Sequence, residues 1–192
     1  MTLNQAIEIL REAGVDAPSH DAEELFYRFG GYSRSTMYLM HNIESDSPKL
    51  IEAVERRAKR EPLQYIIGEV GFYRETYKVT PDCLIPRSDT ETLVDYAVKN
   101  IPEGAKFLDL CTGSGCVAIS TLKNTKNTTA IAVDISTKAI KVAEENADIN
   151  NVADRISFRL ADLMNEVVDE PVFALLSNPP YVSNSAYASL EN

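Results

Sequence analysis

The sequence has few residues of the kinds that bind metal ions or cross-link secreted proteins. Its 192 residues include three cysteines and two histidines. No two cysteines form a C-x-x-C pair, whereas a structural zinc site needs closely spaced ligands and a secreted disulfide framework usually has an even cysteine count. We therefore predict no metal site and reduced thiols.

Long apolar runs are also absent, and acidic residues outnumber basic ones. No run approaches the roughly 20 apolar residues of a membrane-spanning helix, and the N-terminus lacks the basic and then apolar pattern of a signal peptide. We expect a cytoplasmic protein without a membrane partner. The formal net charge of −10 argues against direct nucleic-acid binding without excluding it, because phosphate contacts depend on Lys and Arg, which a local patch can supply.

Residues 1–68 have the pattern of a small helical domain. Thr2 and Gln5 stand at capping-box spacing at the start of the first helix, and Gly14 ends it. Further helices are predicted over residues 19–30, 35–41 and 48–61, the last with Ser47 as its N-cap and Pro62 as its end. Because a bundle of this size usually needs a neighbour to be stable, its outer face is predicted to be either a docking surface for a partner or a simple packing appendage.

Two β-rich runs around Arg74 and Glu75 predict a hairpin, and residues 69–82 are assigned to a hairpin linker. In the polar segment that follows, Ser88 and Glu91 have capping-box spacing before a helix. Arg87 is not explained by capping. Its charged fork, held beside a proline, is suited to face an anionic group.

Residues 83–192 alternate strands with helices, which is typical of a doubly wound α/β sheet. Helices are predicted to start at Cys116 and after Ser136, and strands are predicted over residues 106–110, 129–134, 156–160 and 172–177. Parallel sheets of this class bind ligands outside the carboxyl ends of their strands. Motifs at those ends are therefore the candidate site.

The first of these motifs indicates a nucleotide-like cofactor. Gly113 and Gly115 allow the backbone to approach a ligand at the first strand-to-helix turn, and Asp134 ends the next strand, the usual place for a carboxylate that binds a ribose. The pattern from Asp109 onward is D-x-C-x-G-x-G, not the dinucleotide fingerprint G-x-G-x-x-G. This suits an adenosine-containing cofactor without a pyrophosphate. Asp162, after the third strand, is either a turn residue or a contact to an adenine amino group.

The second motif is Asn178-Pro179-Pro180-Tyr181, after the fourth strand. Carbonyl oxygens from Asn178 and Pro179 are placed to accept both hydrogens of a substrate –NH2 group, and Tyr181 is placed to pack on its flat face. The alternative is a proline-rich turn that closes the strand. The combination of this motif with the glycine loop and Asp134, in order, favours a functional site.

Together these motifs resemble the Rossmann-like methyltransferases that use S-adenosylmethionine to methylate a planar –NH2 group. More narrowly, three stretches resemble the HemK/PrmC family, which methylates the side-chain nitrogen of the glutamine in the GGQ motif of peptide-chain release factors. The stretches are residues 85–91, 109–115 and 178–181. The likeness extends over essentially the whole chain, although Asn-Pro-Pro-Tyr alone is shared with adenine-N6 and cytosine-N4 DNA methyltransferases.

The resemblance implies roles for individual positions. The cofactor site would comprise Cys111, Thr112, Gly113, Ser114, Gly115, Asp134, Asp162, Leu163 and Asn178. The catalytic residues would be Asn178, Pro179 and Tyr181, with Pro180 and Arg87 also contacting substrate. Residues 1–68 would dock the release factor. The family commonly has glycine at position 111 and proline at position 88, and Cys111 is tolerable there if its φ is negative.

Methyltransferases of this class have a seven-stranded sheet, and four parallel strands are predicted here. We therefore expect an N-terminal fragment whose methyltransferase domain, residues 83–192, lacks the last strands and has weak or no activity. Two other functions stay open. One is amino-methylation of adenine or cytosine in nucleic acid, and the other is a non-catalytic module that docks a partner.

Overall fold

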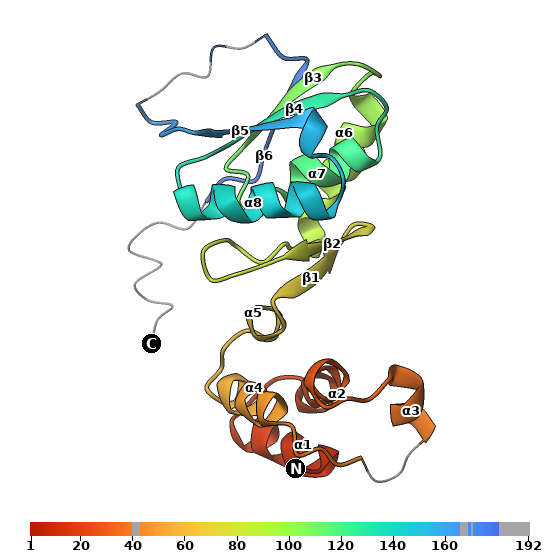
Figure 1. The fold of residues 1–192 in the computed structure, drawn as a ribbon. Coiled ribbons are helices and arrows are strands. Elements are labelled where there is room, and N and C mark those ends of the chain that lie inside the picture. The colour runs from red at the N-terminus through yellow and green to blue at the C-terminus, as the bar shows by residue number, and fades with distance from the viewer. Residues whose placement is uncertain (40–42, 166–168, 170, 181–192) are drawn as a thin grey trace. The chain divides into compact units, whose positions relative to one another are not determined.

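The computed structural model of the chain describes residues 1–39, 43–165, 169 and 171–180. The chain divides into two compact units, Met1–Gly68 and Glu69–Asn192. Figure 1 shows helices in the first unit and a sheet with helices in the second.

The described part of the first unit is helical. Its helices are α1 (Leu3–Glu12), α2 (Pro18–Phe29), α3 (Arg34–Leu39), α4 (Pro48–Ala58) and α5 (Leu63–Ile67). The Thr2/Gln5 capping box is present at the start of α1, as predicted. The core gathers apolar side chains from one face of each long helix, including Leu10, Phe26 and Leu50. These are the faces that the helical periodicity indicates.

Two details of this unit differ from the sequence-based prediction. Ser47 occupies the position before α4, but its side chain makes no capping hydrogen bond. Helix α5 was not predicted, because Pro62 was interpreted only as the end of the preceding helix. Proline also fits the start of a helix, where its missing N–H costs no hydrogen bond, and Pro62 directly precedes α5.

The second unit begins with the hairpin of β1 (Glu69–Phe72) and β2 (Glu75–Lys78). Phe72 pairs with Glu75, so the turn residues are Tyr73 and Arg74, one position earlier than predicted. Tyr73 takes a positive φ of 59°. The turn therefore lacks the glycine or asparagine signal from which its position is usually predicted.

A short helical turn, η1 (Ser88–Thr90), leads into α6 (Glu91–Asn100). The predicted capping box of Ser88 and Glu91 is wrong, because no side chain caps either element. The Glu91 carboxylate instead accepts a hydrogen bond of 2.7 Å from the Tyr73 backbone N–H. Glu91 thus ties the hairpin to the start of α6.

The rest of the unit is a parallel sheet with strand order β5-β4-β3-β6. The strands are β3 (Lys106–Leu110), β4 (Thr129–Asp134), β5 (Ile156–Leu160) and β6 (Ala174–Ser177), joined through α7 (Cys116–Lys123), α8 (Thr137–Ile149) and η2 (Ala153–Arg155). The first three strands have the predicted bounds, and β6 begins two residues later than predicted. Ser136 caps α8 through a hydrogen bond from the Ala139 N–H.

The two faces of this sheet have separate cores. Phe107, Ala132 and Leu176 belong to the larger core, which also contains apolar side chains from α6, α7, α8 and the hairpin. Leu108 and Ile131 form a smaller core on the opposite face. Figure 1 shows α7 and α8 between the sheet and the hairpin. This layering confirms the predicted fold class, an α/β sheet preceded by a helical region. Because the four strands are parallel, their carboxyl ends lie at the same edge of the sheet.

Candidate functional site

The carboxyl ends of the four parallel strands bring the predicted motifs to one edge of the sheet. In spatial order, Asp162 follows β5, Asp134 ends β4, residues 111–115 follow β3, and Asn178 follows β6. Adjacent strands lie roughly 4.8 Å apart, so these groups span a distance of about 15 Å. This is the edge at which open parallel sheets bind their ligands.

The loop after β3 has an unusual backbone. Cys111, Gly113 and Gly115 all have positive φ, at 58°, 55° and 81°. The condition stated for tolerating Cys111, a negative φ, is therefore not met. A residue with a Cβ stands where glycine is favoured, because the β3–α7 connection bends into the left-handed region as soon as the strand ends.

The two glycines have different surroundings. A Cβ on Gly115 would lie 2.9 Å from the Ile119 Cδ1 and 3.1 Å from the Ala143 Cβ, so this glycine lets the loop pack on α8. A Cβ on Gly113 would meet no heavy atom within 4 Å. Gly113 therefore borders open space at the strand ends, where a ligand can approach the backbone.

The Asp134 carboxylate ties this loop to the end of β4. It accepts hydrogen bonds from the backbone N–H groups of Gly113, at 2.9 Å, and Ser136, at 3.0 Å. Asp134 is half-buried. A carboxylate has about four lone-pair sites, so these two bonds leave it able to accept from the hydroxyls of a ribose.

Asp109 supports the loop from below. Its side chain is 1% exposed and accepts a 2.6 Å hydrogen bond from the Thr112 hydroxyl. Burial raises the pKa of Asp109 to about 7, while hydrogen bonds from Thr112 and the Ala118 N–H act in the opposite direction. Thr112 is thereby turned inward and held.

Asp162 forms a local turn after β5. Its carboxylate accepts from the Met164 N–H at 3.0 Å and from the Asn165 side chain at 2.7 Å. The neighbouring Leu163 side chain is 37% exposed. The turn alternative for Asp162 therefore has direct support. An adenine contact through Asp162 and Leu163 stays a prediction.

At the other end of the edge, Asn178 lies in a pocket of about 300 Å³. The lining residues come from the η1 region and the end of β6, and they are Arg87, Asp89, Thr90, Leu93, Ser177 and Asn178. The Asn178 Nδ2 donates to the Thr90 hydroxyl at 3.2 Å. The structure thus brings Arg87 and Asn178 together, 91 positions apart in the chain.

The remaining residues of this motif have different positions. Pro179 and Pro180 are exposed, and Tyr181 lies outside the described residues. The Ser177 hydroxyl donates to the Leu110 carbonyl at 3.0 Å, one residue before the glycine loop begins. The substrate motif therefore adjoins the glycine loop directly.

Sequence reasoning missed two residues of this region. Thr90 lies within the quoted motif of residues 85–91 but had no assigned role. The buried Asn146, on α8, bonds to Lys78 and Ser114. No local pattern reveals contacts across 68 and 32 residues.

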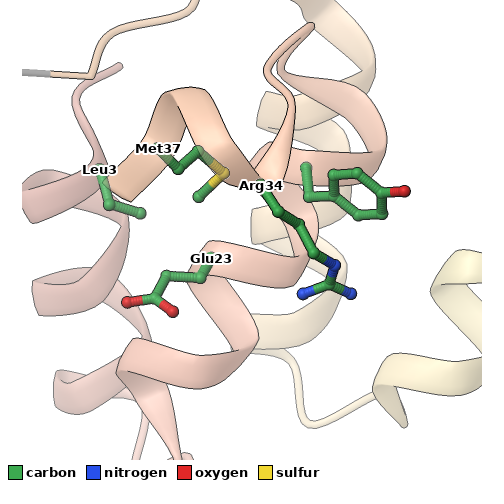
Figure 2. Close-up of a pocket in the computed structure, with 5 residues that line it drawn as sticks. Leu3, Glu23, Arg34 and Met37 are labelled. Carbon is green, nitrogen blue, oxygen red and sulfur yellow. The ribbon is translucent and has the colours of Figure 1, made fainter. Parts of the chain in front are cut away.

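A second, smaller pocket of about 70 Å³ lies in the helical unit, and Figure 2 shows it. Its lining residues are Leu3, Glu23, Tyr27, Arg34 and Met37. The guanidinium of Arg34 lies 4.4 Å from the centre of the Tyr27 ring and pairs with Glu24 at 2.5 Å. The cation–π contact between Arg34 and Tyr27 holds the Tyr27 ring in place along one side of the pocket.

Residues 1–39, 43–165, 169 and 171–180 contain neither a candidate metal site nor a candidate membrane span. In this part of the chain, no group of three or more His, Cys, Asp or Glu side chains is placed to hold a metal ion. Every helix among the same residues is too short or too polar to span a bilayer.

Two family models match the chain. The PrmC N-terminal domain matches residues 2–68, and the methyltransferase small domain matches residues 88–190. The solved complex of aTrm5 with tRNALeu has a TM-score of 0.50 with 20% sequence identity, covering 64% of this chain and 34% of that one. A likeness at this identity concerns the fold alone.

Curated relatives give the same family. A release factor glutamine methyltransferase of Nitratidesulfovibrio vulgaris is 35% identical over 98% of this chain and 65% of its own length. One from Cereibacter sphaeroides is 36% identical over 98% of this chain and 68% of its own. The chain thus spans about two thirds of the length of these relatives. It belongs to the family of the release factor glutamine methyltransferases.

Proposed function

We propose that this chain binds cofactor and substrate for the methylation of the glutamine side-chain nitrogen in the GGQ motif of peptide-chain release factors, with S-adenosylmethionine as donor. The observation that carries the proposal is the single edge on which the glycine loop, Asp134 and Asn178 meet. Family membership supports the same activity. A release-factor substrate would place the reaction in the cytoplasm.

The residues of the loop fit this cofactor. The open space beside Gly113 receives the methionine part, lined by residues 111–115, while Asp134 accepts from the ribose hydroxyls. Asp162 and Leu163 flank the adenine. The cofactor, when bound, would supply a methyl group from its positively charged sulfur and be left as a neutral thioether, and the methylated amide nitrogen would then release one of its two protons to solvent.

The pocket around Asn178 orients the substrate amide. An amide nitrogen is a weak nucleophile because its lone pair is delocalised into the carbonyl. The Asn178 Oδ1 and the Pro179 carbonyl accept its two N–H groups, which raises electron density on the nitrogen and fixes its direction. Thr90 holds the Asn178 amide so that Oδ1 faces the substrate. Pro180 and Tyr181 pack beside the amide, and Arg87 faces an anionic group of the partner.

The helical unit is proposed to dock the release factor. Its pocket of about 70 Å³ has room for a small apolar side chain of the partner, bordered by Met37 and Leu3. Met37→Glu would place a charge there and weaken release-factor binding about tenfold. Ile9→Glu, an exposed position of α1 outside the pocket, is the matched control, and equal loss in both variants would contradict this docking site.

The cofactor part is tested by calorimetric titration of S-adenosylhomocysteine into the chain. Gly113→Val would fill the space beside the loop and abolish binding. Gly104→Val is the matched control, because Gly104 also has a positive φ and open space but precedes β3 at the opposite edge. Absence of binding by the wild-type chain, or equal loss in both variants, would count against the proposed site.

The substrate part is tested with methyl-labelled S-adenosylmethionine and a release factor. Label should enter the GGQ glutamine and should be absent from a release factor with glutamate at that position, which has no amide nitrogen. Asn178→Ala should remove transfer, while cofactor binding should weaken much less, because residues 111–115 and Asp134 remain. Transfer to adenine or cytosine in DNA in place of the release factor would support the nucleic-acid alternative.

A further inference from the structure

Asn146 is a buried amide that joins three separate segments of the second unit. It lies on the face of α8 toward the hairpin and the glycine loop and is 0% exposed. Its Oδ1 accepts from the Lys78 N–H at 2.7 Å, and its Nδ2 donates to the Lys78 and Ser114 carbonyls, both at 2.9 Å. Because one partner is a donor and two are carbonyls, only one orientation of the amide satisfies all three bonds.

The contact to Ser114 acts on the part of the loop that has the least ordinary backbone. Ser114 is buried and stands between Gly113 and Gly115, both with positive φ. Glycine lets many conformations compete at such positions, so a fixed carbonyl between them selects one. One turn earlier on α8, Ala143 packs against Gly115. Helix α8 therefore holds the loop at two points, one apolar and one polar.

The contact to Lys78 holds Asn146 itself in place. Its two hydrogen bonds to the Lys78 backbone imitate the pairing of a neighbouring strand. The hairpin is anchored independently, since the Tyr77 hydroxyl hydrogen-bonds Ser120 at 2.6 Å and Glu75 accepts from Ser120 at 2.8 Å. Asn146 thus fixes the loop relative to the hairpin, because it hydrogen-bonds both.

We propose that Asn146 is a positioning residue for the cofactor loop, acting through the Ser114 carbonyl. This inference rests on the proposed function for its consequence in cofactor binding, but the loop geometry itself is measurable without cofactor. Loss of the amide leaves the Ser114 carbonyl buried without its partner. The loop then samples other conformations, and its affinity for cofactor falls.

Asn150 provides a matched control on the same helix. It is also buried, and its Nδ2 donates to the Thr76 carbonyl at 3.1 Å and the Asn146 carbonyl at 3.0 Å. It therefore ties α8 to the same hairpin but makes none of the hydrogen bonds to the loop. A change seen with Asn146→Ala and absent with Asn150→Ala belongs to the loop contact.

The readout without cofactor is alkylation of Cys111 by iodoacetamide, followed by mass spectrometry. Cys111, the first residue of the loop, is half-buried, while Cys83 and Cys116 are buried. Thiol reaction depends on exposure, so a loosened loop reacts faster. Asn146→Ala should raise the Cys111 rate about tenfold, and Asn150→Ala should leave it within about twofold at similar loss of stability in urea.

The second readout is calorimetric titration of S-adenosylhomocysteine into the same variants. The dissociation constant should rise about tenfold in Asn146→Ala and stay near wild type in Asn150→Ala. If Asn146→Ala does not fold, Asn146→Asp keeps the acceptor for Lys78 and removes both donated bonds, and the same differences are expected. Equal effects at both positions, or an unchanged Cys111 rate in a folded Asn146 variant, would overturn the proposal.

The two readouts separate the inference from the proposed function. A wild-type chain that binds no S-adenosylhomocysteine would contradict the proposed function, while the Cys111 rates would still report whether Asn146 fixes the loop. Binding that persists with an unchanged Cys111 rate in Asn146→Ala would overturn the role of Asn146 alone.

Discussion

At position 111 a cysteine occupies a backbone conformation that costs an L-residue free energy. Its φ of 58° brings Cβ close to the following carbonyl, at about 1–2 kcal/mol. Glycine avoids this contact, but it lowers the free energy of unfolding by about 0.5–1 kcal/mol because it makes the unfolded chain more flexible. Cys111→Gly should therefore raise the free energy of unfolding by about 0.5 kcal/mol, measured from the midpoint of urea denaturation.

Cys111→Ala is the control for this prediction. It removes the thiol but keeps Cβ and therefore the strain of the positive φ. Only the glycine variant should gain stability. A gain of the same size in both variants would mean that the thiol, not the backbone, sets the cost.

Thr90 offers a test of how Asn178 is oriented. Thr90→Val keeps the shape of the side chain but removes the oxygen that accepts from the Asn178 Nδ2. The amide of Asn178 then loses its fixed orientation, and kcat/KM for methylation of a release factor should fall about tenfold. Binding of S-adenosylhomocysteine should be unchanged, since Thr90 contacts Asn178 and no residue of the glycine loop lines their pocket.

Thr90→Ser retains the hydroxyl and should keep most of the activity of the wild-type chain. Parallel assays of transfer and cofactor binding on both variants distinguish positioning from loss of structure. Full activity in the valine variant would show that the Asn178 amide needs no partner at Thr90.

At the scale of elements, the connection between β3 and α7 depends on close packing as well as on flexibility. Gly115→Ala would place a Cβ 2.9 Å from Ile119 and 3.1 Å from Ala143, at a φ of 81°. Strain and overpacking together should lower the free energy of unfolding by about 2–4 kcal/mol. Gly104→Ala has a similar φ and open space, so it should lose only about 1–2 kcal/mol.

Both glycine variants are compared by urea denaturation. The difference between them measures the packing of the loop on α8, because backbone strain is common to the two. If Gly115→Ala and Gly104→Ala lost equal stability, α8 would have moved to admit the methyl group.

Local signals were sufficient to predict the central elements of the sheet. Strands β3, β4 and β5 have the predicted bounds, and helix α8 starts directly after Ser136 as predicted, because each has a uniform local pattern in the sequence. Where a side chain has a distant partner, prediction failed. Glu91 had the spacing of a cap, yet its carboxylate bonds to Tyr73, 18 residues earlier.

At the scale of the whole second unit, the order of strands explains why the motifs could be found and their supports could not. Parallel strands bring their carboxyl ends to one edge whatever their sequences, so Asp134 and Asn178 were placed correctly at strand ends. Thr90 contributes to the site from the helical turn η1, and Asn146 contributes from helix α8. Their partners are 88 and 32 residues away, distances over which no periodicity operates.

The free energy of unfolding of the whole chain should depend on pH through one buried acid, Asp109. Burial raises the pKa of Asp109 from its usual 3.8 to about 7. Between about pH 4 and pH 7, the folded chain therefore keeps a proton on Asp109 that the unfolded chain has released. The contribution of Asp109 to the free energy of unfolding is therefore largest below about pH 4. It decreases as pH rises toward 7, by up to about 4 kcal/mol in total.

Asp109→Asn isolates this contribution, because asparagine can still accept from Thr112 but does not titrate. Other groups act in the opposite direction, such as Glu61, whose pKa is lowered by its hydrogen bond to Arg56. The comparison is therefore the difference in unfolding free energy between wild type and variant, from urea denaturation at several pH values. That difference should shift in favour of the variant as pH rises from about 4 to 7. A difference that is constant across this range would mean that Asp109 ionises normally, and that the loop is held above a carboxylate that stays charged.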